Sequence, residues 1–164
     1  MDDEWARYLD QLEAAETRDF SVAACADSMD LQRGVTGYIY HTVAMAVYAW
    51  YRHFGDFEET IAALLRCGGD TDSTGAVAGA LAGLSSGEEG IPVDWINGIK
   101  DWPRNTRLLR LIGNELSLAQ EGKKETAPVR YFWPAIVPRN LCFLAIVLGH
   151  GLGRLLPFFY YKQR

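Results

Sequence analysis

The chain has 164 residues, enough for one domain with a substantial buried core, and its 49 % hydrophobic content excludes an intrinsically disordered polypeptide. The net charge of −5 is unevenly distributed: residues 123–164 carry seven basic residues against one acid, or +6, which leaves −11 on residues 1–122. An acidic main body argues against nucleic-acid binding, so no nucleic-acid partner is expected.

The cysteine pattern and the first residues indicate a reducing compartment. The three cysteines, Cys25, Cys67 and Cys142, lie at wide, irregular spacing, which is typical of reduced thiols rather than of a disulfide framework. The opening segment MDDEWARYLD is acidic and amphipathic, unlike a signal peptide. We therefore expect a cytoplasmic protein.

Hydrophobic periodicity predicts helices from the start of the chain. The first spans residues 4–16, with Trp5 and Tyr8 on its apolar face. After a loop punctuated by glycines, residues 38–54 are apolar on nearly every side, which predicts a buried helix. Residues 57–66 form the next predicted helix.

Capping residues mark two of the following helix boundaries. Asp56, with Glu59 three residues later, is a capping pair for the helix over residues 57–66. A further helix is expected over residues 73–84, and a short one after Pro92. Pro103 suits the first turn of a helix over residues 103–120. The inward stripe predicted for that helix is Leu108, Leu109, Ile112, Leu116 and Ala119.

The basic C-terminal segment begins with a predicted strap over residues 121–137, which contain two prolines, and ends with an apolar helix over residues 139–155. Its most apolar stretch, residues 141–153, is shorter than the roughly 20 residues that cross a bilayer. We therefore predict a buried helix and treat membrane contact as the less favoured alternative. Because no segment alternates at period two, the sequence predicts an all-α fold.

Two carboxylates and a hydroxyl, Asp70, Asp72 and Ser73, follow a Gly68-Gly69 turn in the motif GGDTDS. Alternate residues of an extended turn point the same way, so the two carboxylates are expected to converge. Oxygen ligands of this kind suit hard cations such as Mg²⁺. The other interpretation is an N-cap for the following helix. The two interpretations are compatible, since Asp72 could cap the helix through one oxygen and bind a metal through the other, and both stay open at this point.

Glycines recur every fourth residue after this turn, at Gly75, Gly79 and Gly83. Each glycine inside a helix costs about 0.5–1 kcal/mol relative to alanine, so a row of three indicates close approach of a neighbour. The predicted neighbour is the backbone of the helix over residues 38–54. The alternative is tight packing without a nearby site.

A longer string around this turn carries a family resemblance. GGDTDSTGAVAGALAG, followed by Ile91-Pro92 and Trp95, resembles the C-terminal signature of the ADP-ribosylglycohydrolase family. The preceding GYIYHTVAMAVYAW and DFEETIAALLRCGGD are similar to the segment that leads into that signature. The resemblance implies an incomplete orthogonal helical bundle over residues 1–122, with a C-terminal extension helix in residues 123–164.

The resemblance also implies an activity and a ligand set. Family members use two Mg²⁺ ions, or Mn²⁺, to hydrolyse the N- or O-glycosidic bond that joins ADP-ribose to an acceptor in a protein or small molecule. The family's metal ligands map onto Asp70, Asp72 and Ser73, with Ser in place of the commoner Thr. Gly37 and Tyr38 fall where the family places substrate-side residues. The alternative for Tyr38 is a buried core tyrosine, and no catalytic residue is assigned.

Other parts of the family pattern are absent from this sequence. It contains no T-D-D ligand motif and no G-N-G phosphate loop. We therefore expect a truncated or split form that is inactive alone and requires a separate N-terminal half. Such a form would expose apolar surface on the helix over residues 38–54. The alternative is a non-catalytic binding or structural module derived from the family. His41 and His53 are predicted to be structural.

Overall fold

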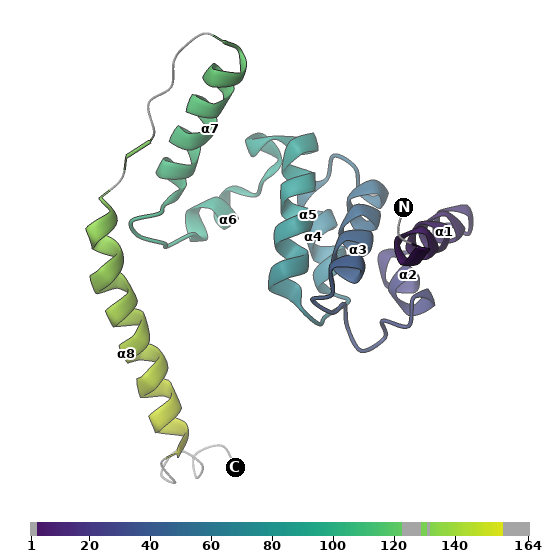
Figure 1. Ribbon diagram of the computed structural model, residues 1–164, viewed down its shortest axis with the longest axis horizontal. Coiled ribbons are helices and arrows are strands. Elements are labelled where there is room, and N and C mark those ends of the chain that lie inside the picture. Colours follow the sequence, from purple (N-terminus) through teal and green to yellow (C-terminus); the bar gives the residue numbers. More distant parts are fainter. Residues whose placement is uncertain (1–2, 123–128, 131, 156–164) are drawn as a thin grey trace. The chain divides into compact units, whose positions relative to one another are not determined.

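The computed structural model describes residues 3–122, 129–130 and 132–155, which form an all-α structure (Figure 1). It divides into two units, Met1–Trp95 and Ile96–Arg164. The described residues contain no β-strand, and their β pairing is a single isolated parallel bridge between Val35 and Gly69. The predicted all-α class is confirmed. The boundary expected between residues 122 and 123 stays a prediction.

The helices of the first unit follow the predicted periodicity closely. They are α1 (Asp3–Thr17), α2 (Val22–Ser28), α3 (Ile39–Arg52), α4 (Phe57–Leu65) and α5 (Thr71–Ser86), followed by the 3₁₀ turn η1 (Glu88–Gly90). The sequence did not predict α2, because seven residues are too few for a helical period to show. Its N-cap Ser21 accepts a hydrogen bond from the Ala24 N–H at 3.2 Å.

The core of the first unit lies where α3, α4 and α5 pack together, with α1 and α2 packed against α3 (Figure 1). Its largest fully buried side chains include Met45 of α3 and Leu64 of α4. The predicted burial of the α3 segment is confirmed along its middle. Apolar side chains are exposed at or just beyond its two ends, at Ile39, Tyr51 and Phe54, while the truncated form from which exposure was expected stays a prediction.

Three buried threonines occupy the same place in three helices. Thr42, Thr60 and Thr74 are each the fourth residue of α3, α4 and α5. Their hydroxyls donate to the carbonyls of Thr36, Asp56 and Asp70, at 3.1, 2.7 and 2.7 Å. A buried hydroxyl without a partner costs about 1–3 kcal/mol, so these bonds hold the start of each helix in the core.

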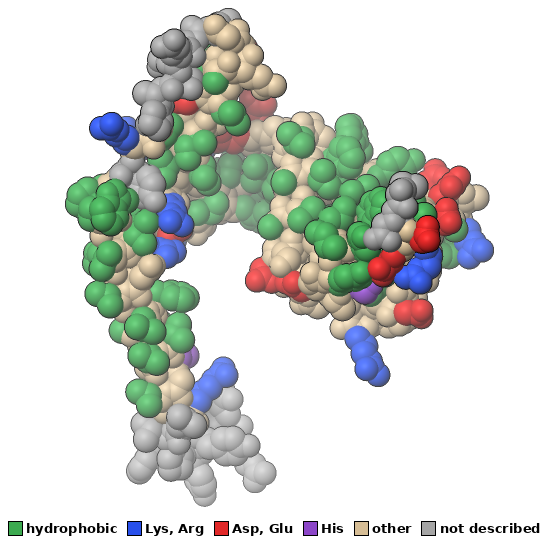
Figure 2. All heavy atoms as spheres, in the orientation of Figure 1, with side chains coloured by type: hydrophobic (Ala, Val, Ile, Leu, Met, Phe, Trp, Pro, Cys, Tyr) green, Lys and Arg blue, Asp and Glu red, His purple; other side chains and the backbone are tan. Residues whose placement is uncertain are grey.

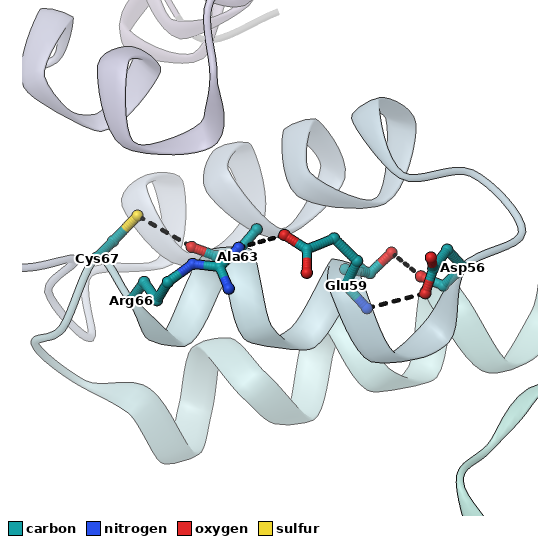
Figure 3. Close-up of polar contacts among 6 residues, drawn as sticks. Asp56, Glu59, Ala63, Arg66 and Cys67 are labelled. Carbon is teal, nitrogen blue, oxygen red and sulfur yellow. Dashed lines mark hydrogen bonds and ion pairs between the residues drawn. The ribbon is translucent and has the colours of Figure 1, made fainter.

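The N-terminal boundary of α4 confirms Asp56 as the cap (Figure 3) but not the reciprocal contact from Glu59, because the Asp56 N–H donates to the His53 carbonyl. The Oδ1 atom of Asp56 accepts from the Glu59 N–H at 2.9 Å. The Glu59 carboxylate in turn pairs with Arg66, and the Cys67 thiol donates to the Ala63 carbonyl at 3.5 Å. These contacts fix both ends of α4 and therefore the start of the turn that follows it.

The glycine row of α5 has a different neighbour from the one predicted. A Cβ at Gly75 or Gly79 would meet side chains of α4 at ordinary distances, 3.5 Å from Leu65 and 3.7 Å from Ile61, while Gly83 faces open space. The prediction of close approach to the α3 backbone is therefore wrong. The tightly packed row of α5 is instead Thr74, Ala78 and Ala82, each at most 1 % exposed.

The second unit contains exposed helices. After α6 (Val93–Gly98), which crosses the boundary between the units, come α7 (Thr106–Gln120), the 3₁₀ turn η2 (Trp133–Ala135) and α8 (Ile136–Leu155). Helix α7 begins after Asn105, whose side chain caps the Leu108 N–H at 3.1 Å, and not at Pro103. Its predicted inward stripe is wrong, because α7 buries no residue and Leu116 is 67 % exposed.

Helix α8 also differs from expectation. It begins three residues earlier than predicted, inside the expected strap, and runs for 20 residues. Part of that strap, residues 123–128 and 131, lies outside the described residues. The prediction of a buried helix is wrong: only 6 % of the apolar window within Trp133–Arg154 is buried. Periodicity identified the helix correctly, but it carries no information on whether a partner surface is present.

Candidate functional site

Asp70 is the N-cap of α5 and is held from both sides. Its Oδ1 accepts from the Ser73 N–H at 3.3 Å, and its carbonyl accepts from the Thr74 hydroxyl. Its own N–H donates to the Val35 carbonyl at 2.7 Å, and the Val35 N–H donates to the Gly68 carbonyl at 3.0 Å. An N-cap is therefore present, but at Asp70 and not at Asp72, because α5 begins two residues earlier than predicted. It leaves the outer carboxylate oxygen of Asp70 for other contacts.

Two glycines allow the loops before α3 and α5 to meet. Gly34 and Gly69 have φ of +111° and +88°, a region that glycine adopts without strain. A Cβ on Gly34 would lie 2.6 Å from the Cα of Gly69, and a Cβ on Gly69 would collide with the Val35 backbone. The Gly-Gly turn therefore permits a close backbone contact, and that contact fixes the position of Asp70.

Asp70 and Asp72 lie together at the start of α5, as its N-cap and as the second residue of its first turn. The pKa of Asp70 lies below its ordinary value because this carboxyl hydrogen-bonds with the Asp72 side chain, then with the hydroxyl and backbone N–H of Ser73. Asp72 and Ser73 are exposed. Two ionised carboxylates so close in sequence repel each other, and a bound cation would offset that repulsion. All donor atoms of these three side chains are hard oxygens, which fit Mg²⁺ or Mn²⁺.

Gly37 lies against the Asp70 carboxylate. A Cβ at Gly37 would collide with the Oδ2 atom of Asp70, so any larger residue would displace the outer oxygen. The structure thus brings Gly37 together with Asp70 and gives a steric reason for glycine at this position. The substrate-side role that the family resemblance implies for this loop stays a prediction.

Tyr38 is the N-cap residue of α3 and is 43 % exposed, so the alternative of a buried core tyrosine is wrong. Its hydroxyl donates to Glu4 of α1 at 2.8 Å, and its ring packs edge-on against Tyr40 and His41. The hydrogen bond to Glu4 is the main cause that raises the pKa of Tyr38 to about 12. Sequence reasoning did not identify Glu4, because its contact joins residues 34 positions apart.

His41 is held at both ring nitrogens. Its Nδ1 lies 2.7 Å from the Thr36 hydroxyl and its Nε2 lies 2.7 Å from the Tyr8 hydroxyl. Burial lowers the pKa of His41, and the charge of Glu4 opposes that shift. His53 is the C-cap of α3, where its carbonyl accepts from Thr60. The predicted structural roles of both histidines agree with these contacts.

The described part of the chain provides one carboxylate pair and no larger acidic cluster. Across residues 3–122, 129–130 and 132–155, no group of three or more His, Cys, Asp or Glu side chains is placed to hold a metal ion. The local donor set is therefore the Asp70 and Asp72 carboxyls with the Ser73 hydroxyl. Three such oxygens fill half of one octahedral Mg²⁺ shell, so further ligands must come from water or from other residues.

Comparisons with known proteins bear on the lineage of this chain. The family model described as ADP-ribosylglycohydrolase matches residues 1–126. An ADP-ribosylhydrolase ARH3 from Danio rerio is 50 % identical over 42 residues, which are 26 % of this chain and 11 % of that protein. The chain thus matches only a small part of this relative's length. No solved structure matches the chain. Because the family model covers most of the sequence, the chain belongs to the ADP-ribosylglycohydrolase family.

Proposed function

We propose that this chain supplies one side of the active site of a metal-dependent hydrolase that cleaves the N- or O-glycosidic bond between ADP-ribose and an acceptor. The observation that carries the proposal is the position of the half-buried Asp70 at the start of α5, where it caps the helix through Oδ1 and leaves Oδ2 beside Gly37, two residues before the exposed Asp72. Membership of the family supports a hydrolase in general terms. The substrate is an ADP-ribosylated protein or small molecule.

Each residue of the pair has a distinct part in the proposal. Asp70 uses Oδ1 to cap α5 and directs Oδ2 past Gly37, while Asp72 and the Ser73 hydroxyl complete the set of oxygens. These residues would hold Mg²⁺, with Mn²⁺ as the alternative. When bound, the metal would polarise a water molecule and the ribose hydroxyls. Tyr38, half-exposed beside Gly37, would contact the ribose or the adenine ring.

The same proposal includes a requirement for more residues. The sequence has no T-D-D or G-N-G motif, so the remaining metal ligands and the phosphate loop would come from a separate N-terminal half. The three cysteines carry no disulfide, as a reducing cytoplasmic location would require. We expect the 164-residue polypeptide alone to bind Mg²⁺ weakly and to show no measurable hydrolysis of ADP-ribosylated protein.

Calorimetric titration with Mg²⁺ and Mn²⁺ tests the carboxylate pair. Asp72→Ala should abolish binding, and so should Asp70→Asn, which removes the charge but retains a good N-cap and thus the stability of α5. Asp94→Ala is the matched control, because Asp94 is the second residue of α6 as Asp72 is of α5. Equal metal binding by the parent protein and Asp72→Ala would refute the metal site.

The non-catalytic module remains a second candidate, favoured by the absence of a third acidic ligand from the described residues. The two functions differ in an assay in which an N-terminal half of a full-length family member is added to this chain. The hydrolase predicts that hydrolysis appears on mixing and is lost with Asp72→Ala. The module predicts that ADP-ribose binds without turnover in either case. If this chain alone hydrolysed the substrate at a rate near that of a full-length relative, the requirement for a separate N-terminal half would be refuted.

A further inference from the structure

Helix α8 is unlike the core helix of a soluble protein. It is long and apolar enough to cross a membrane, with a mean hydropathy of 1.5 over the best window of Trp133–Arg154, yet only 6 % of that window is buried. A core helix of this composition would be mostly buried, and a signal sequence would lie near the N-terminus. Figure 2 shows hydrophobic side chains exposed along the length of α8.

The apolar surface of α8 extends around the helix. Leu144, Leu148 and Leu152 follow one line along it, and they are 51–62 % exposed. Phe143, Ile146 and Val147 lie on other sides and are 49–63 % exposed. A helix that lies flat on a membrane surface has a strongly polar face, whereas a helix that is apolar all round is immersed. The distribution therefore favours insertion over surface binding.

Length and flanking residues agree with a bilayer. Twenty helical residues span about 30 Å, the thickness of the hydrocarbon core. The 14 residues between Arg139 and Arg154 carry no Asp, Glu, Lys or Arg and cover about 21 Å of it, so both arginines must extend their side chains toward the interfaces. Phe132 and Trp133, 71 % and 66 % exposed, precede the helix and are of the kind that gathers at the membrane interface. No acidic residue follows Glu125, and Arg154 lies close enough to the helix end to reach the headgroups.

The charged residue nearest the start of α8 is neutralised. Both Nε and Nη2 of Arg139 lie 2.7 Å from Oδ1 of Asp101. An unpaired Arg in the hydrocarbon is costly, so this pair marks the end of α8 that stays at the water interface. We propose that α8 inserts into a lipid bilayer and anchors the chain to a membrane, with the Asp101–Arg139 pair at the interface. This proposal does not depend on the hydrolase activity.

Vesicle flotation of the full chain tests insertion. The chain is synthesised without cells in the presence of phosphatidylcholine vesicles, with or without phosphatidylglycerol, and the floating fraction is washed with high salt and then alkaline carbonate. We expect flotation with both vesicle types that survives both washes. Failure to float, or release by either wash, would overturn insertion.

Charged substitutions locate the inserting segment. Leu144→Arg with Leu148→Arg should reduce carbonate-resistant flotation at least about tenfold, because arginine near the middle of a membrane helix is strongly disfavoured. Leu109→Arg with Leu116→Arg is the matched control, since these leucines of α7 are 56 % and 67 % exposed and should leave flotation unchanged. Unchanged flotation of the α8 variant would contradict the proposal. A second result would also contradict it: self-association of the chain in lipid-free solution that the Leu144→Arg, Leu148→Arg variant abolishes. The apolar surface of α8 would then be covered by a second copy of the chain.

Thiol labelling provides a measurement without a charged substitution in α8. In a Cys67→Ser chain, Cys142 of α8 is the exposed thiol, because Cys25 is fully buried. A membrane-impermeant maleimide should label Cys142 in detergent-free solution at least about tenfold faster than in vesicles, since thiolate chemistry needs water. Equal labelling rates in both conditions would overturn insertion even if flotation succeeded.

Discussion

Three glycines near Asp70 are needed for steric reasons, and the same glycines position the carboxylate of the candidate site. Gly34 and Gly69 let two loops touch, and Gly37 leaves room for the outer oxygen of Asp70. The capping oxygen of Asp70 faces α5, and its outer oxygen lies beside Gly37, so one carboxylate both begins the helix and keeps an oxygen for other contacts. The alternatives left open by the sequence, N-cap and ligand, are therefore compatible in one side chain.

Gly37→Ala tests whether room for that oxygen matters. The new Cβ would collide with Oδ2 of Asp70, while the backbone of Gly37 lies outside the left-handed region, so the residue itself fits. We expect a loss of unfolding free energy of no more than about 1 kcal/mol, the value of a cap, and at least a tenfold loss in Mg²⁺ affinity. Urea unfolding and calorimetry measure the two effects. Unchanged affinity would show that Gly37 does not shape the site.

His41 predicts a pH dependence of stability. Burial lowers its pKa in the folded protein below the 6.5 of the unfolded chain. The unfolded state then binds more protons than the folded state near and below that pH, so the unfolding free energy falls as pH drops through about 6.5. NMR titration should place the midpoint of His41 below 6.5, and His41→Asn should remove this part of the slope. A midpoint above 6.5 would contradict the inferred burial effect.

Within the element α5, small residues lie in two different environments: some face open space and others are fully buried. Gly83 faces open space, so Gly83→Ala should raise the unfolding free energy by about 0.5–1 kcal/mol through helix propensity alone. Ala78 is fully buried, so Ala78→Leu should lower it by about 1–3 kcal/mol through overpacking. Urea unfolding of both variants checks the assignment. If Gly83→Ala destabilised the protein instead, a neighbour would lie close to Gly83, as the sequence analysis predicted for the glycine row.

Local signals in the sequence predicted the elements of the first unit well. Capping residues and periodicity placed α1, α3, α4 and α5 to within two residues at each boundary, because caps and amphipathic faces are encoded locally. The Tyr38–Glu4 contact and the exposed faces of α7 and α8 were not predicted. They depend on which distant surfaces meet, or fail to meet, and periodicity does not carry that information.

The two units of the whole molecule differ in what stabilises them. Of the described hydrophobic residues that are buried, all but Ala135 lie in Met1–Trp95, together with Asp70, Asp72 and Gly37. Residues 1–122 carry a net charge of −11, while residues 123–164, which contain the apolar helix α8, carry a net charge of +6. The core and the candidate site thus belong to one unit, and the proposed membrane anchor belongs to the other.

This division predicts that residues 1–95 fold alone. The fragment retains the α1–α5 core, so it should show helical circular dichroism, one cooperative urea transition and the Mg²⁺ affinity of the full chain. Leu64→Ala is the control for a true core, because Leu64 is 1 % exposed and its truncation should cost about 2–5 kcal/mol. A gradual transition, or a Leu64→Ala fragment as stable as its parent, would show that the fragment has no packed core. The candidate site would then depend on residues beyond Trp95.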